Sequence, residues 1–126
     1  MKNDDNNSKN SIEKIKQSDN NNIMLTERGS MFGLGNLVVD FRQIIDMKEF
    51  GYPVIMDCTH STQKPSSLGD KSGGERKYAI HIAKLANAID VDGFFFEVHP
   101  DPDNALCDGP NMIQLNNFEN ILKQIA

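Results

Sequence analysis

The hydrophobic positions of the chain fall into three similar units, each a short apolar run, a polar loop and a segment with helical spacing. The apolar runs begin near residues 23, 53 and 93 and end in polar or charged side chains. Helical spacing follows in "LVVDFRQIIDMKEF", "ERKYAIHIAKLANAID" and "NNFENILKQIA". Because the runs are apolar throughout rather than alternating, they predict parallel strands covered on both faces. The pattern therefore predicts an α/β fold of three strand–loop–helix units.

The first 22 residues do not follow this pattern. They contain seven asparagines and several charges, and the string "SIEKIKQS" places Ile12 and Ile15 at helical spacing. We therefore expect residues 1–22 to form a polar, partly disordered segment with a short helix, and residues 23–126 to form the folded domain.

Charged and polar side chains gather where each apolar run ends. In parallel α/β folds, and in (β/α)₈ barrels especially, the carboxyl ends of the strands meet at one edge, where ligands bind. We therefore expect a functional site at this edge of the sheet. Its candidate residues are Glu27 and Arg28, Asp57 and His60, and Glu97 and His99.

Three polar residues near the strand ends form a candidate metal site. His60, Glu97 and Asp108 supply one imidazole and two carboxylates, a set that suits Fe²⁺, Mn²⁺ or Zn²⁺. No short motif joins them, and hydrogen bonding to loop backbones is the alternative interpretation. Cys58 and Cys107 lack the paired spacing of a zinc site, and Cys58 fits a small buried residue better.

Two arginines are candidates for binding an anion. Arg28, after the first apolar run, can hold a phosphate or carboxylate with two parallel hydrogen bonds, or pair with Glu27 at the surface. The long glycine-rich loop that follows His60 is typical of a lid or of a simply mobile segment. Arg76 lies at the end of that loop, where it can reach an anion or only solvent.

Composition narrows the class of protein. The 126 residues suffice for one domain, and a net charge of −5 with scattered basic residues argues against binding nucleic acid. No apolar run approaches the roughly 20 residues of a membrane helix, and the polar N-terminus does not resemble a secretory signal. Two cysteines are too few for a disulfide framework, so we expect a cytoplasmic protein with free thiols.

Four strings, in this order, resemble a known enzyme family. "LTERGSMFGLGNLVVD", "PVIMDCTHSTQKP", "SGGERKY" and "FFFEVHPDPDNALCDGPNM" are similar to the C-terminal part of 3-deoxy-D-manno-octulosonate 8-phosphate synthase, also called 2-dehydro-3-deoxyphosphooctonate aldolase. The resemblance covers nearly all of the chain after its polar start. A related synthase, which makes the heptulosonate phosphate of the shikimate pathway, shares the wider superfamily.

The resemblance implies a (β/α)₈ TIM barrel, a homotetramer and a transferase reaction. The family condenses phosphoenolpyruvate with arabinose 5-phosphate and releases phosphate, and its product feeds the lipopolysaccharide inner core. By the family's motifs, Arg28 would bind phosphoenolpyruvate, Gln63 would lie close to the substrates, and residues 64–75 would close over the sugar phosphate.

The resemblance also assigns the candidate metal site but leaves the metal requirement open. His60, Glu97 and Asp108 would be catalytic, with His60 beside phosphoenolpyruvate. In metal-dependent members the three would ligate a divalent cation, and otherwise they would hold a water in its place. The fourth ligand of metal-dependent members, a cysteine of the first barrel strand, is outside this sequence, and "CDGP" at 107–110 is more similar to the metal-independent branch.

The chain is much shorter than a barrel, which needs roughly 250 residues. Its three units resemble the last three of eight, so we expect part of a truncated or split synthase, with an open sheet face and apolar exposure at "GFFFEV". Such a chain would be active only with a complementing N-terminal chain. The alternatives are an inactive remnant and a small α/β module that binds a ligand or metal without catalysis.

Overall fold

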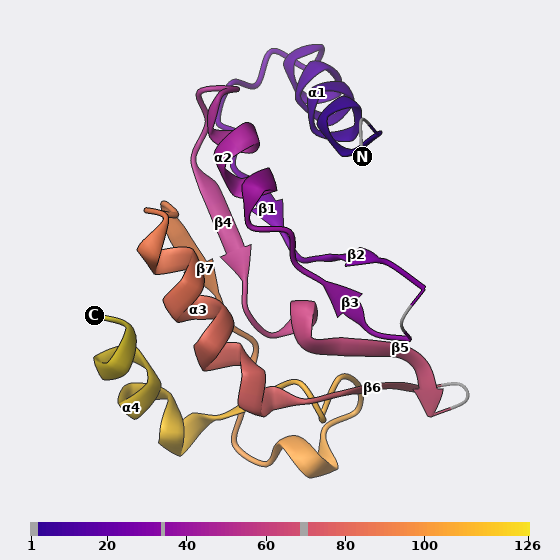
Figure 1. The fold of residues 1–126 in the computed structure, drawn as a ribbon, viewed down its shortest axis with the longest axis vertical. Helices are drawn as coiled ribbons and strands as arrows, with labels where there is room; N and C mark the ends of the chain where they lie inside the picture. Colours follow the sequence, from indigo (N-terminus) through magenta and orange to yellow (C-terminus); the bar gives the residue numbers. More distant parts are fainter. Residues whose placement is uncertain (1–2, 34, 69–70) are drawn as a thin grey trace.

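The computed structural model describes residues 3–33, 35–68 and 71–126 (Figure 1). The predicted loop at 64–75 therefore includes two positions, 69–70, that lie outside the described residues. Within the three described ranges, no helix has the length and apolar character needed to cross a membrane.

The described parts of the chain form four α-helices, nine strands and three short 3₁₀ helices. The helices are α1 (Asn3–Lys16), α2 (Arg42–Lys48), α3 (Ala79–Ala88) and α4 (Leu115–Ile125). The strands are β1 (Leu25–Glu27), β2 (Ser30–Met31), β3 (Leu37–Val38), β4 (Val54–Asp57), β5 (Gln63–Leu68), β6 (Lys71–Gly74), β7 (Gly93–Phe95), β8 (Val98–His99) and β9 (Ile113–Gln114). Short 3₁₀ helices are η1 (His60–Thr62), η2 (Arg76–Tyr78) and η3 (Pro102–Asn104).

A parallel sheet in the order β1–β4–β7 forms the centre of the molecule (Figure 1). Its register pairs Leu25 with Val54 and Ile55 with Gly93, so the carboxyl ends of all three strands lie at one edge. The three predicted strands and the α/β fold class are therefore confirmed.

The helices cover one face of this sheet. Leu25, Val54 and Met56 are buried on that face, and they share one apolar core with Ile44 of α2 and Ala83 of α3. Removing such side chains from water contributes about 25 cal/mol per Å² of apolar surface, which makes this core the main source of stability.

The opposite face of the sheet is open in the described structure. Along β1 burial alternates, with an exposed Thr26 between the buried Leu25 and Glu27, and Phe95 of β7 is 46% exposed. Strands added one after another in one direction, with right-handed crossovers, receive all their helices on the same face. The prediction that the strands are covered on both faces is therefore wrong, whereas the predicted apolar exposure at "GFFFEV" is confirmed at Phe95.

The N-terminal helix is longer than predicted and contributes to the core. α1 starts at Asn3, upstream of the predicted helical string at 11–18. Ile12 is 5% exposed and belongs to the same core cluster as Ile23. The turn of α1 that carries Ile12 therefore packs against the domain, because Ile12 contacts the apolar core, while most of the helix is polar.

Three smaller strand pairs are present besides the main sheet. β2 pairs with β3 and β5 with β6, both antiparallel, and β8 pairs with β9 in parallel. β3 occupies the first residues of the predicted helix at 37–50, so that α2 begins only at Arg42. The β5–β6 hairpin occupies most of the predicted lid at 64–75, where the sequence had indicated only a loop.

Candidate active site

His60, Glu97 and Asp108 lie together at the carboxyl edge of the sheet. One potential ligand atom of each residue lies within 4.8 Å of those of the other two, and all three residues are partly buried. They come from two units of the chain, because His60 opens η1 after β4, whereas Glu97 follows β7 and Asp108 lies further along the same unit, between η3 and β9. The predicted grouping of the three residues is therefore present in the structure.

The orientation of the His60 ring is set by Asp57. Asp57 Oδ2 lies 2.7 Å from His60 Nδ1, and Asp57 Oδ1 accepts the backbone N–H of His60 at 2.9 Å. A carboxylate can only accept, so Nδ1 is the donor of this pair and Nε2 of the neutral ring carries the lone pair. The ring therefore presents an acceptor at Nε2.

That acceptor faces a second acceptor. His60 Nε2 lies 3.1 Å from Glu97 Oε2, and this buried carboxylate oxygen has no hydrogen-bond partner among the described residues. Two lone pairs at this separation repel each other, and either a proton on Nε2, which makes the contact an ion pair, or a bound cation relieves this repulsion. With Asp108 alongside, the donor set of one imidazole and two carboxylates fits a divalent cation, and a histidine held by a carboxylate is the usual form of such a ligand.

Thr59 connects the two strand ends behind these groups. Its hydroxyl donates to Asp57 Oδ1 at 3.2 Å and accepts the backbone N–H of Glu97 at 3.1 Å, and the residue is fully buried. Asp57 was predicted to lie at this edge without a stated role, and Thr59 was not predicted. The signal was present in the string "DCTH", because a tight turn brings an aspartate back to a histidine three positions later.

Gln63 joins the predicted anion-binding arginine to the triad. Arg28 Nη2 donates to Gln63 Oε1 at 3.0 Å, and Gln63 Nε2 donates to Asp108 Oδ1 at 2.7 Å. Asp108 adopts a positive φ of 51°, which is uncommon outside glycine and which often marks a functional position. The five residues to which the resemblance assigned roles, Arg28, His60, Gln63, Glu97 and Asp108, thus form one connected group.

Arg76 holds the loop that carries Asp108. Its Nη2 lies 2.5 Å from Asp103 Oδ1 and donates to the carbonyl oxygen of Gly109 at 3.0 Å. These contacts give Arg76 a structural partner on each side of Asp108, whereas the sequence had left open whether this residue reaches a substrate anion.

The two thiols lie outside the triad. Cys58 is fully buried, as predicted, and burial raises the pKa of its thiol to about 12, with the negative charge of Asp57 acting in the same direction. Cys107 is exposed, and the negative charge of Asp108 raises the pKa of its thiol as well. A thiol that holds its proton is a poor nucleophile and a poor metal ligand.

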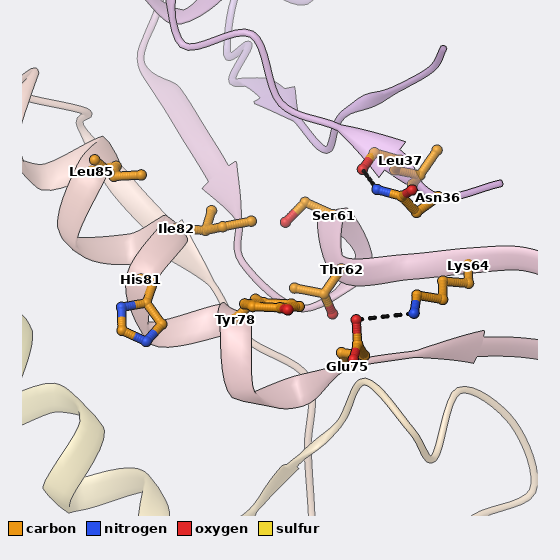
Figure 2. A pocket seen from close by; sticks show the side chains of 10 residues that line it. All are labelled: Asn36, Leu37, Ser61, Thr62, Lys64, Glu75, Tyr78, His81, Ile82 and Leu85. Atoms are coloured by element: carbon orange, nitrogen blue, oxygen red, sulfur yellow. Dashed lines mark hydrogen bonds and ion pairs between the residues drawn. The ribbon is translucent and has the colours of Figure 1, made fainter. Parts of the chain in front are cut away.

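A groove of about 280 Å³ lies between η1 and α3, next to the site (Figure 2). Figure 2 shows Tyr78 and Ile82 on one side, Ser61 and Thr62 on the other, and the 3.0 Å ion pair of Lys64 with Glu75 nearby. None of the triad residues lines this groove. It is therefore a feature of the α3 side of the molecule, separate from the polar cluster.

Comparison with known proteins places the chain in a family. A sequence model of the DAHP synthetase I family matches residues 5–126. The chain therefore belongs to this family.

Relatives share close to half of their aligned residues with this chain and bear the name 2-dehydro-3-deoxyphosphooctonate aldolase. The relative from Desulfatibacillum aliphaticivorans is 54% identical over 112 residues, which are 89% of this chain and 41% of the relative. The relative from Citrifermentans bemidjiense is 50% identical over 117 residues, 93% of this chain and 43% of the relative. The resemblance to this enzyme family is confirmed, and the chain spans about two fifths of the length of these relatives.

Proposed function

We propose that this chain is the C-terminal part of a 3-deoxy-D-manno-octulosonate 8-phosphate synthase and supplies the last three units of a (β/α)₈ barrel. The identity to relatives of that name over about two fifths of their length supports this assignment. So does the sheet, which grows in one direction with its helices on one face, as the wall of a barrel does.

The open surfaces of the sheet support the same proposal. β1 and β7 are the outer strands of the described sheet, and Met24 and Phe95 are 69% and 46% exposed. A cleft of about 250 Å³ lies between α1 and β1, and its apolar lining includes Ile15 and Ile23. These surfaces suit further βα units, supplied by a complementing N-terminal chain, that would continue the sheet on both sides.

The geometry fits the condensation of phosphoenolpyruvate with arabinose 5-phosphate to the octulosonate phosphate and free phosphate. Arg28 would bind the anionic phosphoenolpyruvate, with His60 and Gln63 beside it. The β5–β6 hairpin would cover the sugar phosphate and exclude bulk water from the reacting carbons. The intact enzyme would be a cytoplasmic homotetramer that acts in lipopolysaccharide core synthesis.

His60, Glu97 and Asp108 would hold either a divalent cation or a water at the same place. A bound cation would supply Lewis acidity and an oriented water. The 3.1 Å contact of His60 Nε2 with Glu97 Oε2 is compatible with either occupant, because a bound cation or a proton on Nε2 relieves the contact of two acceptors. The string at 107–110 favours the metal-independent branch, in which the three residues would hold a water instead.

The observation that carries the proposal is the grouping of His60, Glu97 and Asp108 in a chain this similar to those relatives. The test combines the 126-residue chain with the part of the Desulfatibacillum relative that lies outside the matched region. We expect phosphate release from the two substrates in the mixture and from neither part alone. Glu97→Gln should abolish this activity, and Glu119→Gln, a control on the surface of α4, should preserve it.

Two outcomes would contradict the proposal. A stable complex of the two parts that releases no phosphate would identify this chain as an inactive remnant. Tight Mn²⁺ binding by a chain that does not associate with the other part would identify a separate metal-binding module.

A further inference from the structure

The carboxamide of Gln63 is the direct link between Arg28 and the triad. It accepts from Arg28 Nη2 at 3.0 Å and donates to Asp108 Oδ1 at 2.7 Å, and the residue is 7% exposed. We propose that Gln63 is a positioning residue that couples anion binding at Arg28 to cation binding at His60, Glu97 and Asp108. This inference rests on the proposed function, because it assigns those two binding roles.

The chemistry of the link requires an uncharged group with one acceptor and one donor. A guanidinium only donates and a carboxylate only accepts, so the two neighbours of Gln63 fix which way its carboxamide points. Glutamate has the same length but would place a second negative charge against Asp108. Methionine has a similar length and would make neither hydrogen bond.

The backbone of Gln63 is tied to both halves of the site. Its N–H bonds to the carbonyl oxygen of His60, which closes the turn of η1, and its position in β5 pairs with Gly74. The preceding Thr62, whose hydroxyl donates to the carbonyl oxygen of Thr59 at 2.9 Å, has its Oγ1 3.2 Å from Asn111 Oδ1, in the segment that follows Asp108. The backbone of Gln63 therefore cannot shift far without moving the turn that carries His60.

Coupling follows from the restraint on the Asp108 carboxylate. A hydrogen bond to one carboxylate oxygen limits rotation of the group and so fixes the direction in which it offers lone pairs to a cation. An anion bound to the other N–H groups of the Arg28 guanidinium would hold Nη2 on Gln63 and tighten this restraint. Binding of the anion and the cation would then favour each other, and such coupling is reciprocal.

The test uses the complete 126-residue chain, because it contains all five residues. The Mn²⁺ dissociation constant is measured by calorimetric titration with and without saturating phosphoenolpyruvate, with circular dichroism to monitor folding. For the wild type we expect phosphoenolpyruvate to tighten Mn²⁺ binding about tenfold, within the usual range of allosteric coupling. Gln63→Met and Gln63→Glu should reduce this factor to about one, and Gln124→Glu, the same change at an exposed position of α4, should leave it intact.

A factor that is unchanged in Gln63→Met would overturn the coupling. If a variant chain does not fold alone, the same titration is made in the complex with the remaining part of the enzyme. Suppose the wild-type complex releases phosphate but binds Mn²⁺ equally tightly with and without phosphoenolpyruvate. This result would refute the coupling and leave the proposed function standing. Coupling that depends on Gln63 without any phosphate release would support this inference and refute the proposed function.

Discussion

Asp57, which is buried, and His60, which is partly buried, form a pair in which the carboxylate fixes the imidazole. Asp57 Oδ2 lies 2.7 Å from His60 Nδ1, and Asp57 itself is held by the backbone N–H groups of Thr59 and His60. The pair leaves Nε2 directed at Glu97 Oε2, 3.1 Å away. The direction of the His60 lone pair is thus decided by a residue that need not touch any ligand.

Replacing Asp57 with asparagine should weaken cation binding with little effect on the fold. The asparagine oxygen can still accept the backbone N–H groups, but its NH₂ then faces Nδ1 and moves the ring proton to Nε2. Loss of a carboxylate behind a metal-binding histidine typically costs about 10–100-fold in affinity. Mn²⁺ titration of Asp57→Asn and of the exposed control Asp46→Asn checks this, and equal affinities in the two variants would contradict it.

The sequence predicted the sheet because each strand is a continuous apolar run bounded by breaks. Gly51 and Pro53 precede β4, for example, and Gly93 opens β7. The predicted grouping of His60, Glu97 and Asp108 followed from the rule that parallel strands end at one edge, together with the family resemblance. Residues at strand ends could therefore be placed in one site without knowledge of any side-chain conformation.

Other features depend on tertiary contacts that no local pattern records. The β5–β6 hairpin forms in a glycine-rich polar segment, where Lys64 pairs with Glu75 and Gly74 packs against Asn111. On α3 the buried positions are alanines, Ala79, Ala83 and Ala86, whereas the larger Ile82 is only partly buried. Small side chains allow the helix to approach the sheet closely. The hydrophobic pattern alone does not show which face of the helix makes this close approach.

Gly74 should not tolerate a side chain. A Cβ at this position would lie 1.4 Å from Asn111 Oδ1, which also lies 3.2 Å from the Thr62 hydroxyl oxygen. We expect Gly74→Ala to lower the free energy of unfolding by about 1–3 kcal/mol, as for other overpacked sites. Mn²⁺ binding should weaken as well, because Asn111 lies in the segment that follows Asp108. Chemical denaturation and titration measure the two effects.

Two further variants test this explanation. Gly93→Ala is the matched control, because its Cβ would meet only the end of the flexible Ile55 side chain, at 2.9 Å. Adding Asn111→Ala to Gly74→Ala should cost less stability than the two single changes together, because the clash is then removed. Strict additivity of the two changes would show that Gly74 is not restricted by Asn111.

The base of the hairpin should loosen in acid. Hydrogen bonds from Lys64 and then from Lys77 hold the pKa of the Glu75 carboxyl below its usual 4.5. Because this pKa is lowered in the folded protein, the stabilisation that the ionised Glu75 gives to the hairpin is complete above pH 4.5. It is lost as the pH falls below that value and the carboxyl takes up a proton. Protection of β5 and β6 amides from hydrogen exchange should therefore drop below this pH. In Glu75→Gln it should already be low at neutral pH, and equal protection in both proteins would contradict the assignment.

The free edge of β1 offers a direct test of barrel completion. The N–H of Leu25 bonds to Pro53 on the β4 side, so the N–H of Thr26, the next residue, points toward the open edge. Thr26→Pro removes that donor but not the pairing with β4, and proline is tolerated at a sheet edge. The isolated variant should unfold near the wild-type temperature yet fail to join the remaining part of the enzyme.

The effect of Thr26→Pro is measured by mixing the variant with the remaining part of the enzyme and following association and phosphate release. Thr26→Val is the control, because it keeps the N–H and favours an extended strand, and it should associate as the wild type does. If Thr26→Pro associates and restores activity fully, no strand hydrogen-bonds to this edge of β1, and the barrel proposed from the sheet order would be wrong. If only the proline variant fails, the missing units pair with β1 through its backbone, as barrel closure requires.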